Sequence, residues 1–209
     1  MRDGRRIQEY LCRHCGRRFS ATAFSVTYWL RRPDLLIPIA QLITEGAALR
    51  QAARVLGTHH NTVARHVARL ARHCLLFQRK LLRDFTIQEP LVVDGFETFE
   101  FSQFFPLHAN LATGAESWML YHFTDSPLRR HGRMTAGQRT KRAELEKALG
   151  RPDPKAVEKG MMNLLKPMLE LVPAGHMTLH SDDHPANHRA LRRLKREVAE
   201  CPEIDHCDT

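Results

Sequence analysis

The chain has 209 residues, of which 43% are apolar, and a formal net charge of +9. This length accommodates a small module and one medium-sized domain, with enough apolar residues for a sizeable core. No apolar run reaches the ~18 residues of a membrane-spanning helix, and no apolar segment follows the charged N-terminus, so we expect neither a membrane protein nor a secretory leader. The resulting expectation is a cytoplasmic protein.

Positive charge is concentrated at the front of the chain. Residues 1–85 contain 16 Lys and Arg against 5 Asp and Glu, a net charge of +11. Residues 86–209 contain 16 against 18, a net charge of −2. A basic segment of this kind favours DNA or RNA as its partner. We therefore expect the two parts of the chain to have different functions, and we expect residues 1–85 to bind a polyanion.

The first predicted element is a strand, a tight turn and a second strand over residues 7–28. The turn contains a Cys-x-x-Cys motif followed by Gly16, which can adopt the backbone angle of a metal knuckle. A structural zinc site needs four ligands, and Cys12 and Cys15 are two. We therefore predict a partial zinc ribbon over residues 1–30. The odd number and wide spacing of the five cysteines argue against a disulfide framework.

Residues 31–85 predict a helix-turn-helix DNA-binding domain. Apolar residues recur at helical spacing, Gly57 turns the chain between two helices, and the small Ala53 lies where these helices cross. Val63 then faces inward from the second helix. An ordinary three-helix bundle with a basic solvated face is the alternative.

Polar side chains remain outside at the start of that second helix, which is the part of a recognition helix that meets base edges. Nearby arginines are placed to contact phosphates. The predicted DNA-binding residues are Arg50, Arg54, Thr58, His59, His60, Asn61, Thr62, Arg65 and Arg69.

A change of periodicity after the linker Thr86–Pro90 predicts a second domain over residues 90–209. Short apolar runs predict strands, and longer amphipathic stretches predict helices. The expected strands are Leu91–Asp94, Leu107–Thr113, Trp118–Thr124 and Met177–Ser181, and the expected helices are Thr140–Leu149, Ala156–Leu171, with an interruption at Pro167, and Pro185–Glu200. Ser126–Arg133 is expected as a mobile loop, and Cys201–Thr209 as a short polar ending.

Two of these strands end on acids, Asp94 and Asp182. Three antiparallel strands, a helix, a parallel strand and a helix predict an α/β RNase H-like fold, in which the first and fourth strands are neighbours and the two carboxylates meet. Because close carboxylates repel, such a pair predicts a divalent cation, Mg²⁺ or Mn²⁺. Two ions about 4 Å apart would activate a water or 3′-hydroxyl at a phosphodiester. As alternatives, Asp182 caps the following helix, or Asp183 is the ligand.

Four stretches of the chain together resemble insertion-sequence transposases of the DDE, RNase H-like superfamily. The resemblance is to the bacterial branch with an N-terminal zinc ribbon and helix-turn-helix. The stretches are Cys12–Ser20, Arg50–Gly57, Val93–Glu100 and His180–Ala186. The resemblance implies that Asp94 and Asp182 are the first two catalytic acids and that the helix-turn-helix reads inverted repeats at transposon ends. We accordingly expect a nucleoid-associated homodimer on double-stranded DNA.

The chain departs from this family pattern in two places. The family's ribbon has two Cys pairs and its third acid, usually Glu, lies on a helix beyond the fifth strand, whereas Glu197, Glu200 and Glu203 come too early. We therefore expect an incomplete RNase H-like domain in a chain truncated at both ends. A non-catalytic, sequence-specific DNA-binding protein or repressor is the competing hypothesis. A metal-stapled interaction protein is a further one, with the ligands Cys12, Cys15, Cys201, His206 and Cys207.

Overall fold

The computed structural model describes residues 7–173, 176–182, 184–198 and 202–208. The chain divides into two compact units, which we call the front unit (Met1–Leu81) and the sheet unit (Leu82–Thr209). Each unit has a hydrophobic core of its own. No helix in the described part of the chain is both long and apolar enough to cross a membrane.

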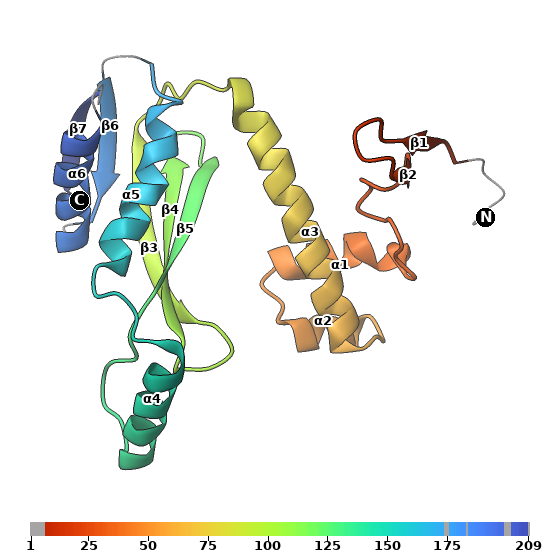
Figure 1. Ribbon diagram of the computed structural model, residues 1–209, viewed down its shortest axis with the longest axis horizontal. Helices are drawn as coiled ribbons and strands as arrows, with labels where there is room; N and C mark the ends of the chain where they lie inside the picture. Colours follow the sequence, from red (N-terminus) through yellow and green to blue (C-terminus); the bar gives the residue numbers. More distant parts are fainter. Residues whose placement is uncertain (1–6, 174–175, 183, 199–201, 209) are drawn as a thin grey trace. The chain divides into compact units, whose positions relative to one another are not determined.

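The described residues of the front unit form a two-stranded hairpin and three α-helices (Figure 1). The strands pair antiparallel across the Cys-x-x-Cys turn. A short 3-10 turn leads into the first helix, and another follows the third helix at the start of the sheet unit. The elements are β1 (Glu9–Leu11), β2 (Arg18–Ser20), α1 (Leu36–Thr44), α2 (Leu49–Val55) and α3 (His60–Leu81).

The three helices pack around a small core. Ala52 and Ala53 are buried where α2 crosses α3, and Ile39 and Val63 are completely buried between the helices. Gly57 has φ +57°, a left-handed backbone conformation that glycine adopts without steric penalty, and it turns the chain between α2 and α3. Ala53 and Gly57 therefore occupy the helix crossing and the turn, as the sequence predicted.

The sheet unit contains a mixed sheet with the strand order β5-β4-β3-β6-β7 (Figure 1). The strand β4 pairs antiparallel with both β3 and β5. The strand β6 is parallel to β3, and β7 is parallel to β6. This mixed α/β arrangement is compatible with the predicted RNase H-like fold. The strands are β3 (Leu91–Phe99), β4 (Pro106–Gly114), β5 (Leu120–Pro127), β6 (His176–Ser181) and β7 (Glu203–Asp208).

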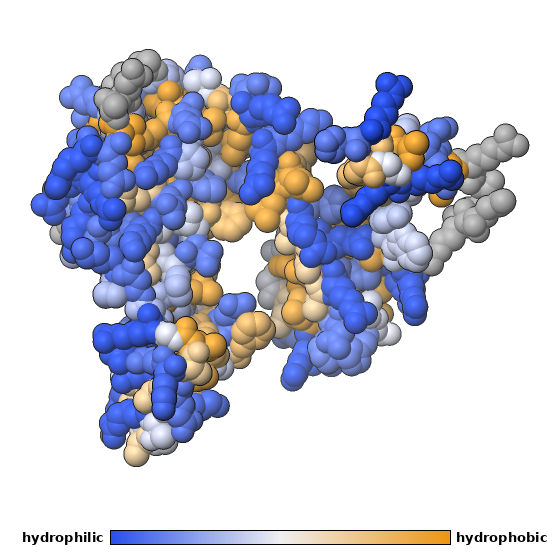
Figure 2. All heavy atoms as spheres, viewed as in Figure 1, coloured by the Kyte–Doolittle hydropathy of each residue, from blue (hydrophilic) through white to orange (hydrophobic). Residues whose placement is uncertain are grey.

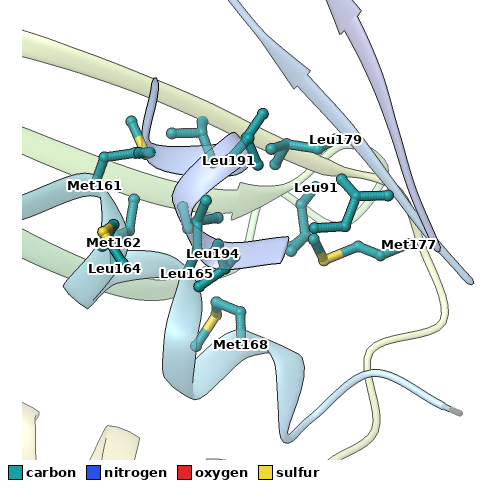
Figure 3. Packing of buried hydrophobic residues seen from close by; sticks show 14 of the residues in the cluster. Leu91, Met161, Met162, Leu164, Leu165, Met168, Met177, Leu179, Leu191 and Leu194 are labelled. Carbon is teal, nitrogen blue, oxygen red and sulfur yellow. The ribbon is translucent and has the colours of Figure 1, made fainter. Parts of the chain in front are cut away.

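Two helices pack on the sheet and enclose the larger core. The helices of this unit are α4 (Ala136–Leu149), α5 (Ala156–Leu169) and α6 (Pro185–Glu197). Methionines and leucines of α5 and α6 interdigitate with Leu91 of β3 and with Met177 and Leu179 of β6 (Figure 3). The opposite side of α6 is hydrophilic in Figure 2. The burial of apolar side chains therefore fixes both helices against the strands β3 and β6.

Gly160 allows α5 to approach β4 and β5 closely. A Cβ atom at this position would lie 2.1 Å from Ser126 Oγ and 2.9 Å from Asn110 Nδ2. The Thr124 hydroxyl donates to the Gly160 carbonyl oxygen over 2.9 Å, and the buried Asn110 amide donates to Thr124 Oγ1 over 3.2 Å. Only glycine fits this polar contact between helix and sheet.

Several element boundaries differ from the sequence prediction for local reasons. The strand β3 continues to Phe99 because β4 pairs with it over its whole length. The strand β5 starts at Leu120, since Trp118 in the preceding turn has φ +58°. It also continues to Pro127, into the segment expected to be a mobile loop.

Two of the helices were also predicted with the wrong extent. The helix α4 begins four residues early because Thr135 and Gln138 form a capping box, in which each side chain accepts the other residue's backbone N–H. The helix α5 is continuous through Pro167, which lies in its last turn and removes one backbone donor only.

The predicted polar ending contains the strand β7. Its register with β6 runs from His176 opposite Glu203 to Ser181 opposite Asp208, and Ile204 is buried in the core. The alternation of Ile204 with polar neighbours was the sequence signal for this strand. The chain therefore contains a fifth strand in this sheet, where the sequence predicted only a short polar ending.

Candidate functional site

The register of the sheet places Asp94 and Asp182 at adjacent positions. The parallel pairing of β3 with β6 ends with Val93 opposite Ser181. Asp94 is the next residue on β3, and Asp182 directly follows the end of β6. Both are exposed. The first and fourth strands of the sheet are neighbours, as predicted, so two residues far apart in the sequence meet at the end of one ladder.

The prediction that Asp94 ends its strand is wrong, because β3 runs on for five residues beyond it to Phe99. Asp94 instead marks the point where β3 loses β6 as a neighbour and continues paired with β4 alone. Its Oδ1 accepts the backbone N–H of Gly95 over 2.6 Å. The carboxylate thus lies beside an open strand edge, which gives access to a ligand.

Asp182 is oriented by the first turn of α6. The Asn187 side-chain amide donates to Asp182 Oδ1 over 2.7 Å, and Asn187 itself is buried. The hydroxyl of the buried Ser181 lies 2.8 Å from His206 Nε2 and connects this contact to β7. The N-cap of α6 is His184, whose Nδ1 accepts the Ala186 N–H, so the alternative role of Asp182 as the helix cap is wrong. Asp183 lies outside the described residues.

His108 is a member of the site that the sequence reasoning missed. Its ring lies over Gly95, where a Cβ atom would come within 2.4 Å of His108 Nε2. Burial lowers the pKa of His108; Glu97, Asp182 and Asp94 oppose this shift through their negative charge. The signal in the sequence was the glycine next to Asp94, since it leaves room for a ring from the neighbouring strand.

The carboxylates of Asp94 and Asp182 could provide part of the coordination shell of a magnesium ion, but not all of its ligands. Among the residues that the structure describes, no three His, Cys, Asp or Glu side chains gather closely enough to hold a metal. Neither Asp94 nor Asp182 forms an ion pair within that set. Mg²⁺ commonly takes one or two carboxylates and completes its shell with water and substrate phosphate. Two adjacent, unpaired carboxylates match that requirement.

None of the described glutamates that the sequence analysis considered lies beside Asp94 and Asp182 as a third acid. Glu197 is engaged by Arg193 and Lys166, at 2.6 and 3.2 Å. Glu203 lies at the start of β7, at the opposite end of the sheet from Asp182. Glu200 is outside the described residues. The register does place Asp208 beside Ser181, at the same end as the two aspartates.

The predicted DNA-binding residues fall into two groups on the helix-turn-helix. Those of the first group are exposed on α2, at the residue before α3 and on the first turns of α3: Arg50, Arg54, His59, His60, Asn61 and Arg65. The second group, Thr58, Thr62 and Arg69, is half-buried. The His59 ring accepts the Asn61 N–H over 3.2 Å at the start of α3. The exposed group is available to a ligand without any rearrangement.

Arg69 differs from the other predicted arginines because its guanidinium already has protein partners. It donates from Nη1 to the backbone carbonyl oxygens of Val26, over 3.4 Å, and of Tyr28. These contacts tie the segment before α1 to α3. A phosphate contact by Arg69 stays a prediction, but the structure gives this residue a packing role that the sequence did not indicate.

The Cys-x-x-Cys turn is closed by a glycine in the left-handed conformation. Gly16 has φ +66°, and its N–H donates to the Cys12 carbonyl oxygen over 2.9 Å. The backbone amides of Cys15 and His14 and the Cys15 thiol lower the pKa of Cys12 by hydrogen bonding. No third ligand joins this pair among the described residues. Cys207 lies on β7 of the sheet unit, and Cys201 lies outside the described residues.

Comparisons with other proteins give structural likenesses only. No protein-family model matches the chain, and no curated protein is similar to it in sequence. It is similar to the N-terminal RNase H domain of a Mycobacterium tuberculosis protein, solved as a fusion with maltose-binding protein. The likeness has 9% identity and a TM-score of 0.31, and covers 57% of this chain and 86% of that one. The case for an RNase H-like fold therefore rests on the order and directions of the strands.

Proposed function

We propose that the protein acts as an insertion-sequence transposase, which binds double-stranded DNA at transposon ends and cleaves and transfers its strands. The observation that carries this proposal is the register of β3 and β6, which puts Asp94 and Asp182 at adjacent positions. The strongly basic helix-turn-helix supports DNA as the substrate. Inverted repeats present two copies of one site, so a homodimer on DNA is part of the proposal.

The chemistry would use the two aspartates as ligands. Mg²⁺ bound by Asp94 and Asp182 would supply an activated water or 3′-hydroxyl and stabilise charge at the phosphodiester. Asn187 holds Asp182 through its amide, and the sheet holds the backbone of Asp94. Burial lowers the pKa of His108, which disfavours a positive charge on its ring beside a bound cation.

Strand cleavage is tested on DNA that contains the element's ends, with Mg²⁺ present. Asp94→Asn and Asp182→Asn should each reduce nicking at least 100-fold, because each removes a carboxylate ligand. Asp125→Asn is the matched control, since Asp125 is an exposed aspartate on β5 of the same sheet. Nicking that persists in both Asp94→Asn and Asp182→Asn would falsify the catalytic proposal.

A second candidate function is sequence-specific DNA binding without chemistry. The observation that favours it is that no group of three metal-binding side chains gathers among the described residues. Such a protein would occupy the transposon ends and repress the element. It predicts the same DNA binding with no nicking by the unaltered chain.

DNA binding itself is tested by titration of labelled end sequences at several salt concentrations. Arg54→Ala and Arg65→Ala should weaken binding and each reduce the salt slope by about one unit. Arg79→Ala is the matched control, because Arg79 is exposed on the same helix as Arg65 but in its last turn. Binding that ignores DNA sequence would contradict both candidate functions.

A further inference from the structure

A cavity of about 660 Å³ lies in the front unit, between α3 and the segment that precedes α1. Five arginines line it: Arg31, Arg32, Arg65, Arg69 and Arg72. The described lining includes no Asp or Glu. Low-dielectric walls concentrate the field of such a set of like charges, so the cavity favours an anionic ligand.

Two polar contacts fix the wall formed by residues 29–32. On one side, Arg69 donates to the carbonyl oxygens of Val26 and Tyr28. On the other side, His66 Nε2 lies 2.9 Å from the Arg32 carbonyl oxygen. Leu30, between these points, is buried. The segment is therefore held at both ends, and the side chains of Trp29 and Arg31 project from a fixed backbone.

Three of the five arginines keep their charge available for a ligand. Arg32 forms a bidentate pair with Asp34, and Arg69 binds backbone carbonyls. Arg31, Arg65 and Arg72 are exposed and form no ion pair with any described residue. Their guanidinium groups are the natural partners of phosphate oxygens.

Trp29 stands at the rim of this cavity in an unusual conformation. Its side chain is 82% exposed, and its φ of +56° is strained for a bulky residue. Backbone strain of this kind clusters at active sites and ligand-binding sites. Trp118 offers a direct comparison, because it is 84% exposed with φ +58° but follows a turn that contains the acidic Glu116.

We propose that this cavity binds a short single-stranded stretch of nucleic acid, with Trp29 stacked on an unpaired base and Arg31, Arg65 and Arg72 on the flanking phosphates. An aromatic platform within a basic groove is how proteins hold single strands, whereas the bases of an intact duplex present no free face. The inference deepens the proposed function, on which it rests for the choice of DNA as the polyanion. The bound nucleotides would be unpaired ones at an opened transposon end.

The direct test uses Trp29 as its own reporter. The chain has two tryptophans, so the Trp118→Phe variant leaves Trp29 as the only one. Titration with a deoxythymidine octamer should quench its fluorescence to saturation, and a duplex of arbitrary sequence should not. Three phosphate contacts predict an affinity loss of about 20-fold when salt rises four-fold, from a slope of about 0.7 per contact for single strands. Equal quenching by a polyglutamate peptide would contradict nucleotide recognition.

Variants separate this site from the rest of the proposed function. By anisotropy of a labelled octamer, Trp29→Ala should weaken single-strand binding about 10-fold, Trp29→Phe should restore part of the loss, and Trp118→Ala should change nothing. Binding of the duplex end should stay within about two-fold in Trp29→Ala. An unchanged octamer affinity in Trp29→Ala would overturn the proposal even if end binding and nicking are intact. Conversely, octamer binding that depends on Trp29 would stand if the protein neither nicks DNA nor reads its ends.

Discussion

The two units of the chain are stabilised in different ways. The front unit encloses a core of a few small and aliphatic side chains, and backbone clamps by His66 and Arg69 add to it. The sheet unit buries a far larger apolar cluster between β3, β6, β7 and two helices. A small core leaves much of a domain's surface free, and here that surface carries the charge. The larger core instead gives rigid backbone positions to two acids.

The same contrast holds for the candidate sites. In the front unit the functional groups lie on a helix surface and on a clamped segment, where long arginine side chains reach a ligand by changing rotamer. In the sheet unit Asp94 and Asp182 are short side chains on neighbouring strands, so their spacing is set by the ladder. Binding of a polyanion tolerates the first arrangement, whereas metal chemistry requires the second.

The largest effect that tests this contrast is expected from the core of the sheet unit. Leu164 of α5 is completely buried in that cluster. Leu164→Ala should lower the free energy of unfolding of the sheet unit by about 3 kcal/mol, through lost transfer free energy and a residual cavity. Hydrogen exchange, followed separately for amides of the two units, measures this change.

The converse variant is the control for this prediction. Val63 is the completely buried residue of α3 in the front core, and Val63→Ala should weaken the front unit only. If Leu164→Ala raises exchange equally in both units, the division into two independently stabilised parts is wrong.

A second effect, of about 2 kcal/mol, is expected where α5 contacts the sheet. In Gly160→Ala the new methyl group would overlap Ser126 Oγ, which the structure places 2.1 Å from the ideal Cβ position. Thermal or urea unfolding of the sheet unit should show the loss. Gly137→Ala in α4 is the matched control, because nothing lies within 4 Å of its ideal Cβ position. A stable Gly160→Ala protein would show that α5 is not packed as tightly as its contacts indicate.

Where periodicity was strong, the sequence predicted the helices of the front unit and the order of strands and helices in the sheet unit. The apolar stripes and Gly57 indicated the helix-turn-helix, and the order of strands and helices indicated that β3 and β6 are neighbours. The sequence could not indicate how far strands extend without a change of residue type. The strand β3 continues past Asp94 because β4 supplies backbone partners, and β7 is recognisable mainly by Ile204.

The candidate sites were predictable only in part. The acids followed apolar runs, which is a local signal, and so Asp94 and Asp182 could be proposed as candidates. His108, Asn187 and Trp29 belong to their sites through contacts that the sequence does not encode locally. His108 reaches its site across the β3–β4 ladder, Asn187 by a hydrogen bond back to the strand end, and Trp29 by the clamping of a loop against α3.

A third, smaller effect is expected from the clamp of the front unit. His66 is buried, and its two ring nitrogens lie 2.8 Å from the Thr62 carbonyl oxygen and 2.9 Å from the Arg32 carbonyl oxygen. His66→Ala should destabilise the front unit by about 1 to 2 kcal/mol, because a part-buried carbonyl loses its partner. His73→Ala, on the same helix and only half-buried, is the control. If His66→Ala and His73→Ala lose equal stability, the hydrogen bonds of His66 do not contribute specially to the stability of the front unit.

The smallest predicted effect is the contribution of Glu89 to the stability of the sheet unit, which is lost at low pH. Glu89 accepts hydrogen bonds from the Ser117 hydroxyl, over 2.5 Å, the Tyr121 hydroxyl, over 2.6 Å, and the amides of Ser117 and Glu116. These contacts, led by that of the Ser117 hydroxyl, lower the pKa of Glu89 from 4.5 to about 2. Because the folded pKa lies below the unfolded one, this contribution to stability is complete above pH 4.5 and is lost as pH falls toward about 2.

Glu89→Gln should therefore lower the stability of the sheet unit at neutral pH and flatten its decline between pH 4.5 and about 2. The front unit should keep its acid profile, since Glu89 belongs to the other unit. Glu116→Gln is the control, because Glu116 contacts Glu89 through its backbone and keeps that hydrogen bond. Urea unfolding at a series of pH values measures the difference. An unchanged slope in Glu89→Gln would mean that the carboxylate contributes no more when folded than when unfolded, and that the acid response of the sheet unit arises from other carboxylates.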